Sequence, residues 1–180
     1  MSKFYTKITS RLQKFIEAQK IFFIATAPNS GRINLSPKGM DSFRVINENR
    51  VLWLNVTGSG NETAAHLNEN KRITIMFCSF EKVPNILRLY GKGKEIKPND
   101  ATWNKVISLF SETPGTRQIF DITIESAQTS CGMSIPFYEF KGERNDLNNW
   151  AENQGEENIK QYWEDKNQTS IDGLPTHILE

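Results

Sequence analysis

A glycine-rich turn between two apolar segments constrains this chain more than any other feature. The stretch covers residues 51–77 and reads VLWLNVTGSGNETAAHLNENKRITIMF. Its first six residues are apolar or β-branched except for Asn55, which is typical of a strand. A turn with two glycines follows, and the alanines and leucine of residues 62–67 then favour a short helix. The pattern predicts a strand, a turn, a helix and a second strand.

Such a turn suits a phosphate group. Glycine lets a ligand approach the backbone closely, and the first turn of a helix carries N–H groups that lack partners within the helix. Ser59, Asn61 and Thr63 lie in this region and add neutral hydrogen-bond donors. The same residue types also cap ordinary helices. A capped loop that binds no ligand is therefore the alternative interpretation.

Composition narrows the classes of partner. The 180 residues contain 22 Lys and Arg against 21 Asp and Glu, so no broad charge favours nucleic acid or an anionic membrane. Residues 1–20 carry charges throughout, unlike a signal peptide, and the apolar run 21–27 is too short to span a bilayer. Two cysteines, Cys78 and Cys131, make neither a disulfide framework nor a metal site. We expect a cytoplasmic protein with no nucleic-acid or membrane partner and no bound metal.

Short strands dominate the first 130 residues. Apolar residues at spacings of three and four predict an amphipathic helix over residues 3–18. A second helix starts near residue 98 and buries Trp103, Val106, Ile107 and Phe110. Strands are predicted over residues 21–27, 32–36, 51–56, 72–78, 86–90 and 120–128. Six short strands with helices at the ends indicate an α+β fold with an antiparallel barrel rather than a parallel sheet.

The last forty residues differ in composition from the rest. Residues 142–180 are mostly polar and predict two short helical pieces. Each piece has a few apolar side chains that can be buried. We expect a barrel domain over residues 1–141 and a polar helical extension over residues 142–180. The extension would pack on the same domain or on the partner of a dimer.

The order of these segments resembles a known family. The predicted N-terminal helix is followed by IFFIATA, INLSPKG, the central stretch described above and LRLYGKG. Over about residues 6–97 this order is similar to the pyridoxamine 5'-phosphate oxidase-like family of FMN-binding split β-barrels. The resemblance implies an antiparallel six-stranded split barrel with peripheral helices. It also implies a homodimer that binds two FMN molecules in clefts at the subunit interface.

The resemblance assigns cofactor-binding roles along the chain. The backbone of Leu35, Ser36 and Lys38 would run beside the isoalloxazine ring, and Trp53 and Asn55 would follow the ribityl chain. Ser59, Asn61 and Thr63 would bind the phosphate. Thr63 stands where the family usually has a lysine, so the cation must come from elsewhere. Lys38, Arg88 and Arg72 are the candidates, and for Arg88 a solvated position on a strand face is the alternative.

The chain also departs from the family at its end. Pyridoxamine phosphate oxidases end in an arginine-containing segment that binds the substrate phosphate, whereas this chain has no arginine after Arg144. We therefore expect an FMN-dependent oxidoreductase that uses another small-molecule substrate or electron donor. The alternative is a module of the same barrel that binds flavin, deazaflavin or haem without turnover. Haem would need an axial ligand, for which the histidines are His66 and His177.

Two further residues have alternative interpretations. His66 is either a proton donor or a histidine solvated on a short surface helix. Cys131 is either a reactive thiol near the flavin or a small buried hydrophobic residue. In both cases the sequence favours the second, structural interpretation.

Overall fold

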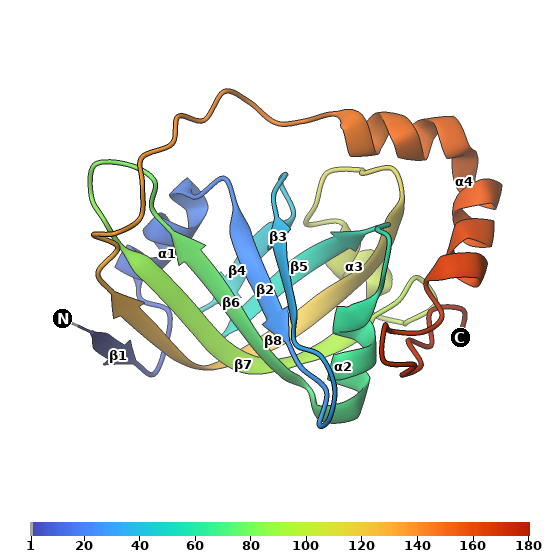
Figure 1. The fold of residues 1–180 in the computed structure, drawn as a ribbon, viewed down its shortest axis with the longest axis horizontal. Coiled ribbons are helices and arrows are strands. Elements are labelled where there is room, and N and C mark those ends of the chain that lie inside the picture. The colour runs from blue at the N-terminus through green and yellow to red at the C-terminus, as the bar shows by residue number, and fades with distance from the viewer. Residues whose placement is uncertain (1) are drawn as a thin grey trace.

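The computed structural model describes residues 2–180 and shows one antiparallel sheet of eight strands with four helices around it (Figure 1). The strands are β1 (Lys3–Tyr5), β2 (Phe22–Thr26), β3 (Asn34–Lys38), β4 (Phe43–Asn47), β5 (Arg50–Val56), β6 (Arg72–Cys78), β7 (Ile86–Ile96) and β8 (Thr116–Ser130). The helices are α1 (Ser10–Ala18), α2 (Glu62–Asn70), α3 (Trp103–Ile107) and α4 (Asp146–Lys166).

The sheet curls into an open barrel. Its strands follow the order β3-β2-β6-β7-β8-β5-β4, and β1 pairs with β8 outside this path. β3 and β4 are therefore the two edges. The curl brings the Phe22 ring of β2 to 5.1 Å from the Phe43 ring of β4, measured between centroids. The predicted α+β split barrel with peripheral helices is confirmed.

Strand β5 lies between two apolar cores. Val51 and Trp53 point into the barrel, where the Trp53 ring stacks on Phe120 at 5.0 Å between centroids. Leu52 and Leu54 point outward and pack beneath α3. A strand buried on both faces needs apolar residues at nearly every position, which explains the continuous apolar run of the sequence. The stripe predicted for residues 103–110 packs here, with Val106 and Phe110 buried and Trp103 and Ile107 partly buried.

The predicted number of strands is wrong. The structure has eight strands, because β1 and β4 lie in segments where the sequence predicted a helix or no element. Helix α1 starts at Ser10, where the Thr9 side chain accepts a hydrogen bond from the backbone N–H of Leu12. Residues 3–5 instead pair with residues 127–129 of β8. Pairing with a strand so distant in sequence leaves no local signal.

The segment after β8 runs up past α1 and along the top of the view in Figure 1 before α4 begins. Helix α4 consists of two helical pieces that meet at Gly155, where φ is 71° and ψ is 168°. The two helical pieces predicted beyond residue 142 are thus present. The last residues then return to the side of the barrel that carries α2 (Figure 1). Among residues 2–180, no helix combines the length and the apolar character needed to cross a bilayer.

Candidate functional site

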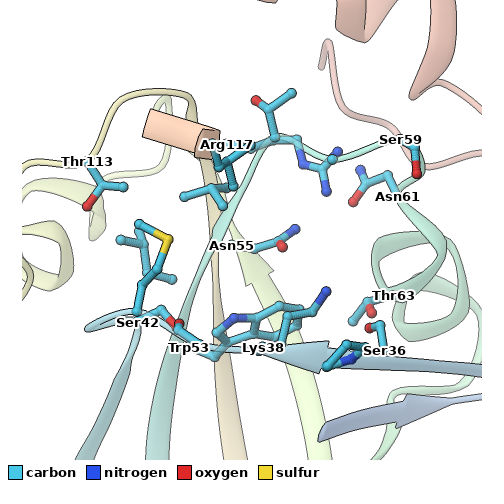
Figure 2. A pocket seen from close by; sticks show the side chains of 18 of the residues that line it. Ser36, Lys38, Ser42, Trp53, Asn55, Ser59, Asn61, Thr63, Thr113 and Arg117 are labelled. Atoms are coloured by element: carbon cyan, nitrogen blue, oxygen red, sulfur yellow. The ribbon is translucent and has the colours of Figure 1, made fainter. Parts of the chain in front are cut away.

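A cleft of about 560 Å³ lies between β3, β5 and the start of α2 (Figure 2). The glycine turn 57–61 forms one wall, and residues 111–113 together with Arg117 form another. Leu147 and Asn148, at the start of α4, also line it. The volume is in the usual range for sites that bind a cofactor or a small substrate.

Seven of the nine residues predicted from the sequence line this cleft. They are Ser36, Lys38, Trp53, Asn55, Ser59, Asn61 and Thr63. Three distant segments bring them together: the edge strand β3, the end of β5, and the turn that leads into α2.

Two predicted residues do not line the cleft. Side chains alternate along β3, so Leu35 points away from Ser36 and Lys38 and is 64% exposed. Arg88 lies on β7, and its Nη1 donates a hydrogen bond to Ser130 Oγ on β8. The third candidate cation, Arg72, lines a separate hollow on the outside of the barrel. Lys38 is therefore the only predicted cation that reaches the cleft.

Sequence reasoning missed Arg117, a buried cation of the cleft that is 4% exposed. On β8, Gln118 pairs with Asn55 and Thr116 pairs with Val56, so Arg117 is the extra residue of a β-bulge. A bulge redirects the side chain of the extra residue. Arg117 Nη1 thereby donates to two acceptors in other segments, the Gly60 carbonyl at 3.1 Å and Asn167 Oδ1 at 2.7 Å. Its Nε is buried and has no hydrogen-bond partner.

A weak signal for this arginine exists in the sequence. It follows the Pro114-Gly115 turn by two positions, at the start of a strand. The predicted strand began only at residue 120, which left the arginine in a loop. No local pattern shows that a bulge would turn it inward.

Two cations, Lys38 and Arg117, line the cleft together with the acidic Asp41, Glu62 and Glu112, of which Asp41 is paired with Arg44. Lys38 Nζ lies 5.4 Å from the centroid of the Trp53 ring. Burial, together with repulsion from Arg117, lowers the pKa of Lys38 to about 8. Burial lowers the pKa of Arg117 to about 10, so this guanidinium stays charged at neutral pH. An anion between these two cations would relieve their repulsion.

The start of α2 leaves polar groups available. Asn61 occupies the N-cap position, but its side chain makes no capping hydrogen bond. Its Oδ1 instead accepts from Gln118 Nε2 at 2.7 Å, and its Nδ2 is buried without a partner. The acidic Glu62 is occupied elsewhere, because its carboxylate accepts from the backbone N–H of Ile171. The turn is therefore not simply a capped helix start, and an unpaired donor lies at the cleft that Lys38 and Arg117 line.

The histidines and the second cysteine lie outside the cleft. His66 is fully buried, with Nδ1 3.0 Å from Thr26 Oγ1, so the expected solvated position is wrong. The reason is that α2 packs against β2 and β7 and buries residues 63–67. Cys131 is exposed, contrary to the expected buried position. His177 lies near the C-terminus, where its Nδ1 is 2.7 Å from Glu180 Oε1.

The fold is shared with solved structures at low sequence identity. A structure of HupZ from Group A Streptococcus has a TM-score of 0.56 at 20% identity, covering 68% of this chain and 99% of that one. A putative pyridoxamine 5'-phosphate oxidase from Lactobacillus delbrueckii has a TM-score of 0.55 at 17% identity, covering 68% and 94%. HutZ, the haem storage protein from Vibrio cholerae, has a TM-score of 0.51 at 18% identity, covering 71% and 98%. These similarities establish the fold.

Sequence comparison identifies the family. Residues 8–131 match the family model described as pyridoxamine 5'-phosphate oxidase. The chain is also 35% identical, over 195 aligned residues, to the pyridoxamine 5'-phosphate oxidase family protein ustO from Aspergillus flavus. That alignment covers 97% of this chain and 78% of the relative. The chain therefore belongs to the pyridoxamine 5'-phosphate oxidase family.

Proposed function

We propose that the chain binds FMN in this cleft and acts as an FMN-dependent oxidoreductase. The observation that carries the proposal is the buried Arg117, whose Nε has no partner, beside the glycine turn of the cleft. An unpaired buried donor on a charged group is costly, and a bound anion would satisfy it. Family membership supports a flavin as the ligand that carries this anion.

The phosphate of FMN fits the donors at the turn. Arg117 Nη1 has two protons and two acceptors, which leaves Nε and Nη2 as one edge of the guanidinium for a ligand. A phosphate can accept two parallel hydrogen bonds from such an edge, one from each nitrogen. Asn61 Nδ2 and the first N–H groups of α2 add further donors. Arg117 thus supplies the positive charge that Thr63 lacks.

The ring end of FMN would lie beside β3, as the resemblance implies. Ser36 and Lys38 point into the cleft there, and Trp53 forms the floor beneath Lys38 (Figure 2). A bound flavin can accept a hydride and pass its electrons to an acceptor. The part of this chain is to orient the ring and to keep a positive charge, that of Lys38, beside it. We propose a small-molecule substrate or a reduced nicotinamide nucleotide as the electron donor.

Haem binding is the second candidate, because HutZ is described as a haem storage protein and shares the fold. Haem needs an axial ligand. Neither of the two histidines lines the cleft, and His66 is held by Thr26. A phosphate-bearing flavin accounts for the buried arginine, whereas haem leaves the glycine turn unused. The cleft therefore favours FMN.

The visible absorbance spectrum of the purified protein, followed by heat release and mass analysis of the ligand, tests the proposal. We expect flavin bands and release of about one FMN per chain. A haem spectrum would contradict the proposal, as would a colourless protein that does not bind added FMN. Anaerobic addition of NADH or NADPH then distinguishes an oxidoreductase from a non-catalytic module, because only the former reduces its flavin.

We propose a homodimer with the clefts at its interface. The edge strand β3 exposes Leu35 beside the cleft, and the neighbouring Ile33 is 77% exposed. The segment between β8 and α4 exposes Met133 and Phe137. Exposed apolar side chains on an unpaired strand edge are typical of an interface. Sedimentation equilibrium should give twice the mass of one chain, and the mass of a single chain would contradict the dimer.

FMN affinity should fall as the pH rises above about 8. Lys38 loses its proton near that pH in the free protein, and a bound anion favours the charged form. Binding then requires proton uptake, so the dissociation constant should rise up to about tenfold between roughly pH 7 and 9. Fluorescence titrations across this range measure the effect. Lys38→Met should bind FMN more weakly at pH 7, and its dissociation constant should change little with pH. Lys92→Met replaces an exposed lysine as a control, and its dissociation constant should rise with pH as that of wild type does.

A further inference from the structure

We propose that Asn167, which follows α4, is a positioning residue that holds Arg117 for the phosphate and so sets the preference for FMN over riboflavin. The inference rests on the proposed FMN site. It concerns a residue outside the segment 8–131 that matches the family model. It therefore gives the C-terminal extension a specific role in ligand selection.

One amide group connects the cation to the glycine turn. Asn167 is fully buried, and its Oδ1 accepts a hydrogen bond from Arg117 Nη1 at 2.7 Å. Its Nδ2 donates to the carbonyl oxygen of Gly58 at 3.1 Å. The side chain therefore uses its acceptor for the arginine and its donor for the turn. Aspartate would lose the donor and add a negative charge beside Arg117, and alanine would lose both contacts.

The position of Asn167 is itself fixed by the chain around it. Its backbone carbonyl accepts from Thr176 Oγ1 at 2.6 Å, and its backbone N–H donates to the carbonyl of Trp163 at 2.9 Å. Trp163 Nε1 donates to Thr57 Oγ1 at the first residue of the turn. The extension thus contacts the barrel of its own chain at the turn. An asparagine held at both backbone groups loses little entropy when it orients a neighbour.

Holding Nη1 determines which edge of Arg117 faces a ligand. Asn167 and the Gly60 carbonyl occupy Nη1, so Nε and Nη2 remain for the phosphate. Burial raises the pKa of Glu95 to about 7, so this side chain is partly ionised at neutral pH and in that form attracts the same guanidinium. Its Oε1 is buried without a partner. Without Asn167, Arg117 would be free to turn toward Glu95. A guanidinium paired with a carboxylate binds phosphate less strongly.

The test compares dissociation constants for FMN and riboflavin, which differ only in the phosphate. Asn167→Ala should weaken FMN binding about tenfold and leave riboflavin binding unchanged, because a hydrogen bond to a charged group is lost. Asn167→Asp should reduce the FMN preference further. Asn158→Ala, which changes an exposed asparagine of α4, should behave as wild type. Thr176→Val, which removes only the hydroxyl bonded to the Asn167 carbonyl, should produce a smaller fall of about threefold.

Two results would overturn this inference. One is an unchanged ratio of the two dissociation constants in Asn167→Ala and Thr176→Val. The other is an equal loss for both flavins, which would indicate general damage to the cleft. In either case wild type still binds FMN and the proposed function stands. If wild type binds no FMN, the proposed function fails and this inference fails with it.

Discussion

Replacing Arg117 with glutamine is expected to weaken FMN binding about a hundredfold. The change removes the buried cation of the turn and the charge-assisted hydrogen bonds that we propose it donates to the phosphate, each worth about 1.5–3 kcal/mol. Riboflavin has no phosphate, so its affinity should change little. Quenching of flavin fluorescence measures both dissociation constants.

Two other variants sharpen this prediction. Arg88→Gln is the matched control, because Arg88 lies outside the cleft and donates to Ser130 on the barrel surface. It should bind FMN as wild type does. Arg117→Lys keeps the charge but loses the planar edge of donors, so its FMN affinity should fall between those of wild type and Arg117→Gln. Equal FMN affinities for Arg117→Gln and Arg88→Gln would contradict the phosphate site.

Replacing Gly91 with alanine is expected to lower the free energy of unfolding by about 3 kcal/mol. Gly91 lies on β7 beside a register shift, where β8 carries Glu125 as an extra residue. An added Cβ at Gly91 would lie 2.2 Å from the carbonyl oxygen of Thr123 and 3.2 Å from Cα of Ile124. Both atoms belong to the backbone of the paired strand, so neither can move without disrupting the sheet.

Urea denaturation of wild type and of Gly91→Ala measures this loss in the free energy of unfolding. Gly39→Ala serves as the control, since its added Cβ would make only an ordinary contact, 3.5 Å from the carbonyl oxygen of Lys20. Gly39 has no positive φ, so alanine adds no backbone strain there. Similar small losses in the two variants would contradict the close approach of β7 and β8 at Gly91.

The sequence predicted the parts of the cleft that depend on local patterns. Alternation along residues 32–36 predicted the strand observed as β3, the apolar run of residues 51–56 predicted β5, and the glycines predicted the turn between β5 and α2. The turn itself indicated Ser59, Asn61 and Thr63, whereas Ser36 and Trp53 were named from the family resemblance. The family resemblance extended this prediction to the identity of the cofactor, which stays a prediction.

Other features depend on contacts between segments that are distant in sequence. β7 continues through Gly91 to Ile96, although two glycines suggested an end near Tyr90, because β6 and β8 pair with it on both sides. Arg117 reaches the cleft through a bulge that is defined only by the partner strand. Asn167 meets Arg117 across 50 positions of the chain. Periodicity within one segment carries no information on such contacts.

A titration of the wild-type protein with FMN and with riboflavin tests whether the cleft recognises the phosphate of a flavin. We expect saturable binding of one FMN per chain, with a dissociation constant at least about a hundredfold lower than that for riboflavin, because in the proposed site the phosphate interacts with a buried arginine. Equal affinities would show that the cleft does not recognise the phosphate. Failure to bind either flavin would contradict the flavin site altogether.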